Sequence, residues 1–288
     1  MIVALPPLAA EQLFTVSGLP VTNTMVNAWL ALAVFFVLGV CVRFFWIKNV
    51  SALGAPLGAL NFMERLVELV LDYMDRVTNN RARSLRLLPI VGSLFLFILT
   101  ANWMGLLPGT GSIGLWVTHE GAKEFLPLFR PANTDLNMTL AMAVLAVVAS
   151  HVLGAVTIGF ASYAGRFLKI APLVKAFRDV SPVGILVAVV EFFVGIIEIF
   201  SEVAKMVSLS LRLYGNIFAG EVLLTVIASL VSFFVPLPFM VLEIIVGLVQ
   251  ATVFSMLTLV YLNMAMTEHG GHVEAHEGPV VIETGVRG

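Results

Sequence analysis

Residues 205–221, KMVSLSLRLYGNIFAGE, carry charged and amide side chains inside a long apolar run. The polar members of this segment are Lys205, Ser208, Arg212, Asn216 and Glu221. A carboxylate can take up and release a proton, whereas an arginine guanidinium stays protonated in proteins. Ionisable side chains within a membrane are costly and usually mark ion paths. The segment therefore predicts a proton path beside a cation of fixed charge.

The polar face of this segment continues toward the N-terminus of the run. Four charged residues recur at intervals of seven, namely Glu191, Glu198, Lys205 and Arg212. A straight α-helix drifts only about 20° per seven residues, so these side chains share one stripe. Because a lipid-facing charge would be expensive, we expect the stripe to face protein or water. The alternative interpretation is a set of buried structural ion pairs.

The last apolar run carries Glu243 and Gln250, again seven residues apart. The pair Glu221 with Glu243 and the pair Arg212 with Gln250 share nearly the same midpoint in the sequence. A hairpin turning there, just before the helix-breaking VPLP of residues 235–238, would bring both pairs together. Two neighbouring carboxylates at low dielectric resist being ionised at the same time. Such a pair is suited to exchange protons near neutral pH.

The whole chain has the composition of an integral membrane protein. Of its 288 residues, 59% are hydrophobic and 12% are charged, and the mean hydropathy is +1.01. A helical span needs roughly 20 apolar residues, and the runs that qualify are 26–47, 87–107, 136–163, 182–235 and 239–266. From Pro182 to Arg212 a helix would rise about 45 Å, against a bilayer core of about 30 Å. We therefore expect the fourth run to tilt steeply.

The predicted fold class is an all-α polytopic membrane protein, with a single helical membrane domain over residues 1–268. Residues 182–266 would form a long tilted hairpin that carries the ion path. Residues 61–78 place apolar and charged side chains at helical spacing, which predicts an amphipathic helix on the membrane surface, either a connector or a docking helix. The Gly- and Pro-containing loop 108–135 is expected to be irregular. The Gly-rich, polar residues 269–288 predict a disordered cytoplasmic tail.

The distribution of basic residues predicts how the chain sits in the membrane. Eleven Lys and Arg lie within residues 43–86 and 166–178, against Lys123 and Arg130 in the loop 108–135. Loops rich in Lys and Arg stay in the cytoplasm. Residues 1–25 and the loop 108–135 should therefore lie outside, and the C-terminus in the cytoplasm.

Several further residues leave two interpretations open. Asp135 and Asn137, at the outer end of the third run, would either line the mouth of a channel or cap a helix. His151 would either form an interhelical hydrogen bond or relay protons. Cys41 is the only cysteine, and the chain has no phosphate-binding loop and no paired metal ligands on a helix. We expect no metal, no cofactor and no nucleic-acid partner.

Three segments resemble subunit a of the F-type ATP synthase, the stator part of its membrane motor. They are SLSLRLYGNIFAGE (208–221), LVQATVFSMLTLVYLNMA (248–265) and, more loosely, NTDLNMTLAMA (133–143). Similarity in helix order and motif placement extends over about residues 60–268. The resemblance implies a hairpin that packs against a rotating ring of c subunits, with two aqueous half-channels that reach mid-membrane from opposite sides.

The resemblance also implies a role for each candidate residue. Arg212 would separate the half-channels, favouring the ionised ring carboxylate and blocking direct proton transfer between them. Glu221 and Glu243 would belong to the outer half-channel, and Gln250 would lie beside the arginine. The residues expected near the arginine or along the cytoplasmic half-channel are Glu198, Lys205, Ser208 and Asn216. Position 243 is glutamate where some members of the family carry histidine, so the titration of this pair cannot be taken from those members.

A member of this family would translocate protons and would not be catalytic alone. Its partners would be the c-ring, subunit b of the peripheral stalk, the other synthase subunits, protons and the bilayer of a bacterial inner membrane. One rival function is an ion-coupled secondary transporter, which usually shows an internal repeat; we find no second copy of the arginine segment. Another rival is an assembly subunit whose charges only lock helices together, in which Arg212→Lys should be tolerated.

Overall fold

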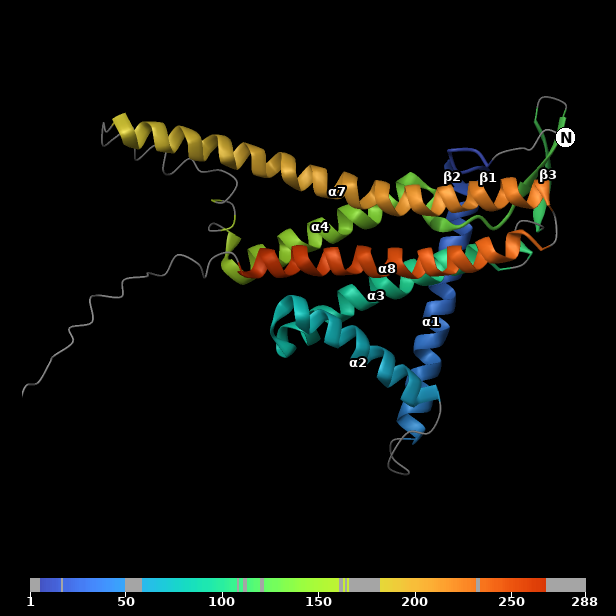
Figure 1. Cartoon of the computed structure of the whole chain (residues 1–288), viewed down its shortest axis with the longest axis horizontal. Coiled ribbons are helices and arrows are strands. Elements are labelled where there is room, and N and C mark those ends of the chain that lie inside the picture. The colour runs from blue at the N-terminus through green and yellow to red at the C-terminus, as the bar shows by residue number, and fades with distance from the viewer. Residues whose placement is uncertain are drawn as a thin grey trace, which may run out of the picture.

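Figure 1 shows long helices gathered into a bundle, with two short β-hairpins near one end. The structure, a computed structural model, describes residues 6–16, 18–49, 59–107, 109–110, 113–119, 122–160, 163, 165, 182–231 and 234–267. The predicted tail 269–288 lies outside the described residues.

Five helices of the described chain are long and apolar enough to cross a membrane. They are α1 (Asn23–Asn49), α3 (Arg81–Gly105), α4 (Leu136–Ile158), α7 (Pro182–Leu230) and α8 (Pro236–Thr267). Each corresponds to one of the five apolar runs of the sequence. The prediction of an all-α polytopic membrane protein is therefore confirmed.

The amphipathic helix predicted over residues 61–78 is also present, as α2 (Ala59–Thr78). Its apolar face is buried against α3 and α8 through Met74, which is fully buried in a cluster with Leu87 and Leu259. The Arg81 guanidinium donates a hydrogen bond of 2.7 Å to the Asp75 carboxylate, across the turn from α2 to α3. The Ser84 hydroxyl and the Arg81 guanidinium lower the pKa of Asp75, since both stabilise its ionised form.

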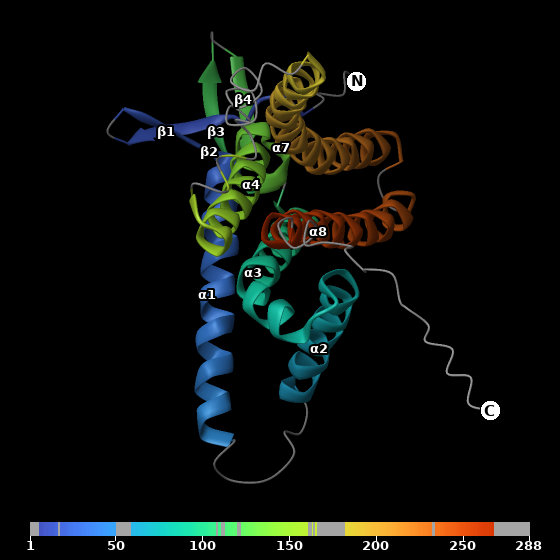
Figure 2. The same cartoon turned by 90° about the vertical axis from the view of Figure 1, so that its left-hand side faces the viewer.

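The long hairpin is formed by α7, of 49 residues, and α8, of 32 residues. α7 ends at Leu230 and α8 begins at Pro236, so the turn lies where the shared midpoint of the polar pairs placed it. Figures 1 and 2 show the two helices side by side and crossing α1 at a steep angle. The hairpin and α1 therefore run in clearly different directions, and the steep tilt of the hairpin in a bilayer stays a prediction.

The main apolar core joins α3, α4, α7 and α8. Its fully buried residues include Ile98, Ala143, Leu213 and Phe254, one from each of these helices. A smaller cluster of alanines, Ala28, Ala31, Ala101 and Ala132, lets α1 approach the end of α3. One end of α7 extends beyond the rest of the bundle, as Figure 1 shows. The core therefore leaves much of α7 uncovered.

Two antiparallel β-hairpins lie near the end of the bundle where α7 passes into α8, which we call the hairpin end. β1 (Gln12–Val16) pairs with β2 (Leu19–Thr22), and β3 (Gly114–His119) pairs with β4 (Ala122–Pro127). The expectation that loop 108–135 is irregular was therefore wrong for residues 114–119 and 122–127. The GLWVT run is rich in aromatic and β-branched residues, which favour strands. A short 3-10 helix, η2 (Ala132–Thr134), then leads into α4.

Candidate functional site

Arg212 lies on the exposed side of α7, with the exposed apolar Leu211 beside it. Within the part of the chain that the structure describes, its guanidinium makes no hydrogen bond or ion pair. The adjacent side of the helix is closed, because Leu209 and Leu213 are buried in the core. The local helix thus directs a permanent cation away from the bundle, toward whatever covers this face.

One turn further along α7, Asn216 connects the arginine segment to α8. The Asn216 Nδ2 donates a hydrogen bond of 2.8 Å to the Gln250 Oε1. Gln250 is only 3% exposed, and its Nε2 is buried without a hydrogen-bond partner among the described residues. The hydrogen bond of Gln250 is to Asn216, one helical turn from Arg212, so the position of Gln250 beside the arginine stays a prediction.

The two glutamates of the predicted pair lie on the same cavity. This cavity, of about 210 Å³, is near the hairpin end, and its wall includes Glu221, Glu243, Asn102 and Arg130. Glu243 is 8% exposed, and its carboxyl group lies directly against Gly220, where a side chain would overlap it. Gly220 is what lets α8 bring this acid next to Glu221. The cavity is polar where the carboxylates meet it and can admit water.

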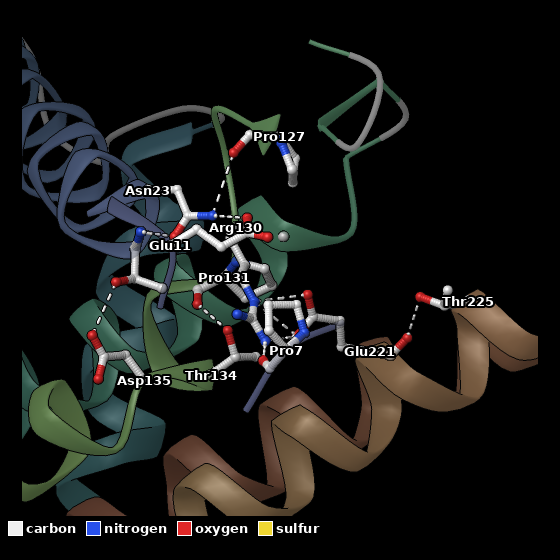
Figure 3. A network of polar contacts seen from close by, with 12 residues as sticks. Pro7, Glu11, Asn23, Pro127, Arg130, Pro131, Thr134, Asp135, Glu221 and Thr225 are labelled. Atoms are coloured by element: carbon white, nitrogen blue, oxygen red, sulfur yellow. Dashed lines mark hydrogen bonds and ion pairs between the residues drawn. The ribbon is translucent and has the colours of Figure 1, made fainter. Parts of the chain in front are cut away.

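Arg130 binds Glu221 in a bidentate arrangement, as Figure 3 shows. The Arg130 Nε donates to the Glu221 Oε1 at 3.0 Å, and the Nη2 donates to the Oε2 at 3.0 Å. The same guanidinium donates to the carbonyl oxygens of Pro7 at 2.8 Å and Ala9 at 3.2 Å. Arg130 is only 2% exposed, and the Glu221 carboxylate compensates its buried charge.

A second group of titratable side chains lies far from the hairpin end, around Lys205. Its Nζ donates a hydrogen bond of 2.7 Å to the Glu202 Oε1 and lies 5.3 Å from the centroid of the Tyr261 ring. The other Glu202 oxygen lies 3.6 Å from the His151 Nε2, and the His151 Nδ1 forms a hydrogen bond of 2.7 Å with the Tyr163 hydroxyl. His151 therefore joins elements by hydrogen bonding, as one of its two interpretations predicted.

The remaining candidates of the stripe occupy the same helix. Ser208 is exposed, and Glu198 is partly buried and makes a contact of its own. With Lys205 and Arg212 they extend along one side of α7, as the spacing of seven predicted.

Asp135 is the N-cap of α4, because its carboxylate accepts a hydrogen bond of 2.9 Å from the Asn137 backbone N–H. Its second oxygen accepts from the Thr24 hydroxyl at 3.0 Å, which ties α4 to α1. Asp135 and Asn137 line a different cavity from the two glutamates, of about 340 Å³, beside β2 and the start of α1. These hydrogen bonds favour the capping interpretation over the channel-mouth interpretation.

Sequence reasoning missed Arg130 as part of this site. The available signal was its position, since it is one of only two basic residues in loop 108–135 and follows the strand region directly. Nothing in the spacing of Arg130 and Glu221, 91 residues apart, indicates that they meet. His151 was noted in the sequence, but its approach to Glu202 across two helices was not predicted.

Comparisons with known proteins show the family to which this chain is similar. The family model described as ATP synthase A chain matches residues 25–263. The chain belongs to this family. A protein of Moorella thermoacetica named ATP synthase subunit a is 28% identical over 251 residues, which cover 87% of this chain and 94% of that relative. A protein of Gloeobacter violaceus with the same name is 32% identical over 251 residues, covering 87% of this chain and 86% of the relative.

Family membership confirms the resemblance that residues 208–221 and 248–265 carry. Residues 208–221 and residues 248–263 of the second segment lie within the matched range, on α7 and α8. The family and the five apolar helices together make this chain a membrane subunit of the ATP synthase.

Proposed function

We propose that this chain is the proton-conducting stator subunit of an F-type ATP synthase, in which Arg212 separates two half-channels beside a rotating c-ring. The observation that carries the proposal is the exposure of Arg212 on the polar side of α7, beside the exposed apolar Leu211, without a partner among the described residues. A cation facing lipid would be expensive. A cation facing a rotating ring would form a temporary ion pair with each carboxylate of the ring as it passes.

The pairing of the neighbouring polar groups supports this assignment. Asn216 is bound to Gln250, and Lys205 is bound to Glu202, so both have partners within the chain. Arg212, between them, is left to interact with another molecule. Its permanent charge would favour the ionised form of the rotor carboxylate opposite it. The guanidinium also cannot pass a proton on, because it stays protonated.

The outer half-channel would run from the hairpin end through the cavity of Glu221 and Glu243 to the rotor surface. Glu221 lies nine residues beyond Arg212, or about 14 Å along the helix axis at 1.5 Å per residue. The cavity supplies space for water, and the two carboxyl groups supply sites for a proton. Asn216 and Gln250 lie between this cavity and the arginine.

The other half-channel would approach Arg212 from the opposite end, along Glu198, Lys205 and Ser208. Glu202 and His151 add two titratable groups beside it. Both residues line a small cavity of about 10 Å³, which is about the space that one water molecule needs. Protons leaving the rotor would pass this group on the way to the cytoplasm.

In this proposal the hairpin end faces the outside of a bacterial inner membrane. Residues 1–25 and the segment 108–135 are then external, as the distribution of basic residues predicts. The exposed apolar side of α7 would be covered by the c-ring, and subunit b would bind elsewhere on the bundle. The chain alone would not be catalytic, since ATP chemistry would belong to its partners.

The decisive experiment is ATP-driven acidification of inverted vesicles that contain the whole complex, with Arg212→Ala compared with wild type. Arg86→Ala is the matched control, because Arg86 is an exposed arginine at the start of α3, far from the hairpin end. Blotting for the chain and its partners establishes equal assembly. We expect Arg212→Ala to abolish pumping and Arg86→Ala to leave it unchanged.

Pumping that survives in Arg212→Ala would make the arginine a structural charge and would refute the separator. Arg212→Lys tests the same point, since a charge that only locks helices together should tolerate lysine. A wild-type complex without any coupling to ATP would favour an ion-coupled secondary transporter instead.

A further inference from the structure

The network of Figure 3 joins three segments that are far apart in the sequence. Arg130 lies between β4 and η2, Glu221 lies on α7, and Pro7 and Ala9 precede β1. The planar guanidinium uses its fork to bind both oxygens of the carboxylate, and its other N–H groups bind the two carbonyl oxygens. A guanidinium bound on all these sides has one orientation.

The backbone around Arg130 is fixed as well. Its carbonyl oxygen accepts a hydrogen bond of 2.7 Å from the Asn27 Nδ2 of α1. The next residue, Pro131, packs so closely on Gly105 that a side chain at Gly105 would overlap the proline ring. The backbone at Arg130 is thus fixed by contacts with α1 and α3. With its backbone fixed, the Arg130 side chain can hold the Glu221 carboxylate in one position.

The N-terminal segment crosses α7 at the same place. The Tyr214 hydroxyl donates a hydrogen bond of 3.3 Å to the Leu8 carbonyl, between the two carbonyls that Arg130 binds. The Tyr214 ring stacks on Phe218 at 5.5 Å between centroids, and the Arg130 guanidinium lies 6.0 Å from the Phe218 centroid. Three consecutive carbonyl groups therefore attach the N-terminal segment to the arginine and to α7.

Glu243 differs from Glu221 in this respect. It is 8% exposed, and among the described residues its carboxylate has no hydrogen bond and no ion pair. It shares the cavity with Glu221 and Arg130, which are the other charged groups on that wall. Of the two acids on the cavity, one is thus bound to a fixed cation and the other is not.

We propose that Arg130, seated on the carbonyls of Pro7 and Ala9, is a positioning residue that fixes the Glu221 carboxylate and leaves Glu243 to exchange the proton. Glu221 then acts as a stationary anion that orients water in the cavity. Proton transfer into the cavity ends on Glu243, which has no fixed counter-ion to displace. The inference rests on the proposed function, since it assigns roles within the outer half-channel.

The test measures passive proton conduction per assembled complex, in vesicles whose catalytic sector has been removed. The variants are Arg130→Lys, Arg130→Gln, Glu243→Gln and the double variant Arg130→Gln with Glu221→Gln. Arg86→Gln is the matched control, because it neutralises an arginine far from the cavity. The double variant removes both charges of the Arg130–Glu221 pair, so neither is left buried without the other, and it should assemble even where a single variant does not.

We expect Arg130→Gln to lower conduction on the order of tenfold to a hundredfold, since a misplaced group in a reaction path has an effect of this size. Arg130→Lys should recover part of the loss, because lysine keeps the charge without the bidentate fork. The double variant should retain measurable conduction, no lower than that of Arg130→Gln. Glu243→Gln should abolish conduction, and the control should match wild type.

Wild-type conduction per complex in Arg130→Gln, with only the amount of complex reduced, would show a structural clamp and overturn the proposal. Conduction that survives in Glu243→Gln would overturn the division of roles. If Arg130→Gln does not assemble, Arg130→Lys decides, since conduction equal to wild type would refute positioning. ATP-driven pumping of Arg212→Ala, measured in vesicles that keep the catalytic sector, separates this failure from failure of the proposed function. Pumping that survives there would refute the proposed function itself.

Discussion

Gln250→Leu should separate the function of the hairpin from its stability. Gln250 is 3% exposed, yet its Nε2 has no hydrogen-bond partner in the described part of the chain. Leucine has a similar size and no polar atoms, so it removes this buried donor. Its loss also releases Asn216, which is exposed and can turn to another partner. We expect the fold to be unharmed and proton pumping to fall sharply.

The magnitude follows from the hydrogen bonds involved. A buried donor without a partner costs about 1–3 kcal/mol, which Gln250→Leu recovers. The hydrogen bond lost from Asn216 contributes about 1 kcal/mol net. The two contributions oppose each other, so the change in stability should lie between about zero and 2 kcal/mol of stabilisation. The proposed role in the proton path beside Arg212 would account for a glutamine at this position despite such a cost.

The assay compares two properties of the same preparation. One is ATP-driven acidification of inverted vesicles, and the other is the temperature at which the detergent-solubilised complex loses this chain. Ser255→Ala is the control, because the Ser255 hydroxyl is likewise buried without a partner among the described residues, five residues further along α8. It should keep both properties. If Gln250→Leu loses stability and pumping together, or keeps full pumping, the reasoning is refuted.

Two further substitutions test other parts of the structure. Gly220→Ala should favour the helix by about 0.5–1 kcal/mol but displace the Glu243 carboxyl, so pumping should fall in a fully assembled complex. The control Gly92→Ala has ordinary space around the new methyl group and should leave pumping unchanged. Equal pumping in the two variants would contradict the cavity geometry. The lowered pKa of Asp75 means that its interactions with Ser84 and Arg81 stabilise the junction of α2 and α3 above about pH 3.8, the ordinary pKa of the group. This contribution is lost as the pH falls through the lowered value. Spin labels on the two helices should report loosening in acid, and Asp75→Asn should show the loosened distance already at pH 7.

The sequence predicted the main features of the hairpin because they depend on local periodicity. The spacing of seven along α7 and the common midpoint of the polar pairs require only a regular helix and one turn. The structure has both, with Gln250 on Asn216 and Glu243 beside Glu221 on one cavity. Hydropathy likewise located all five apolar helices, since a span must satisfy its backbone within itself.

Other features depended on contacts between distant segments. The β3 and β4 hairpin was missed because its glycines and prolines suggested an irregular loop, and its strands satisfy each other rather than a larger sheet. The approach of His151 to Glu202 requires the packing of α4 on α7. Whether Asp135 capped a helix or lined a mouth could not be decided from its residue type, since both uses need the same carboxylate.

By itself, the sequence determined that the chain is a membrane protein, where its helices lie, and that a permanent cation stands among acids on one helical face. Each of these follows from local composition and from the 3.6-residue period. Only the tertiary structure decided which acid has a partner, since Arg130 reaches Glu221 across 91 residues while Glu243 remains without one in the described chain. The physical reason is that burial and charge compensation are properties of assembled segments, which no single helix contains.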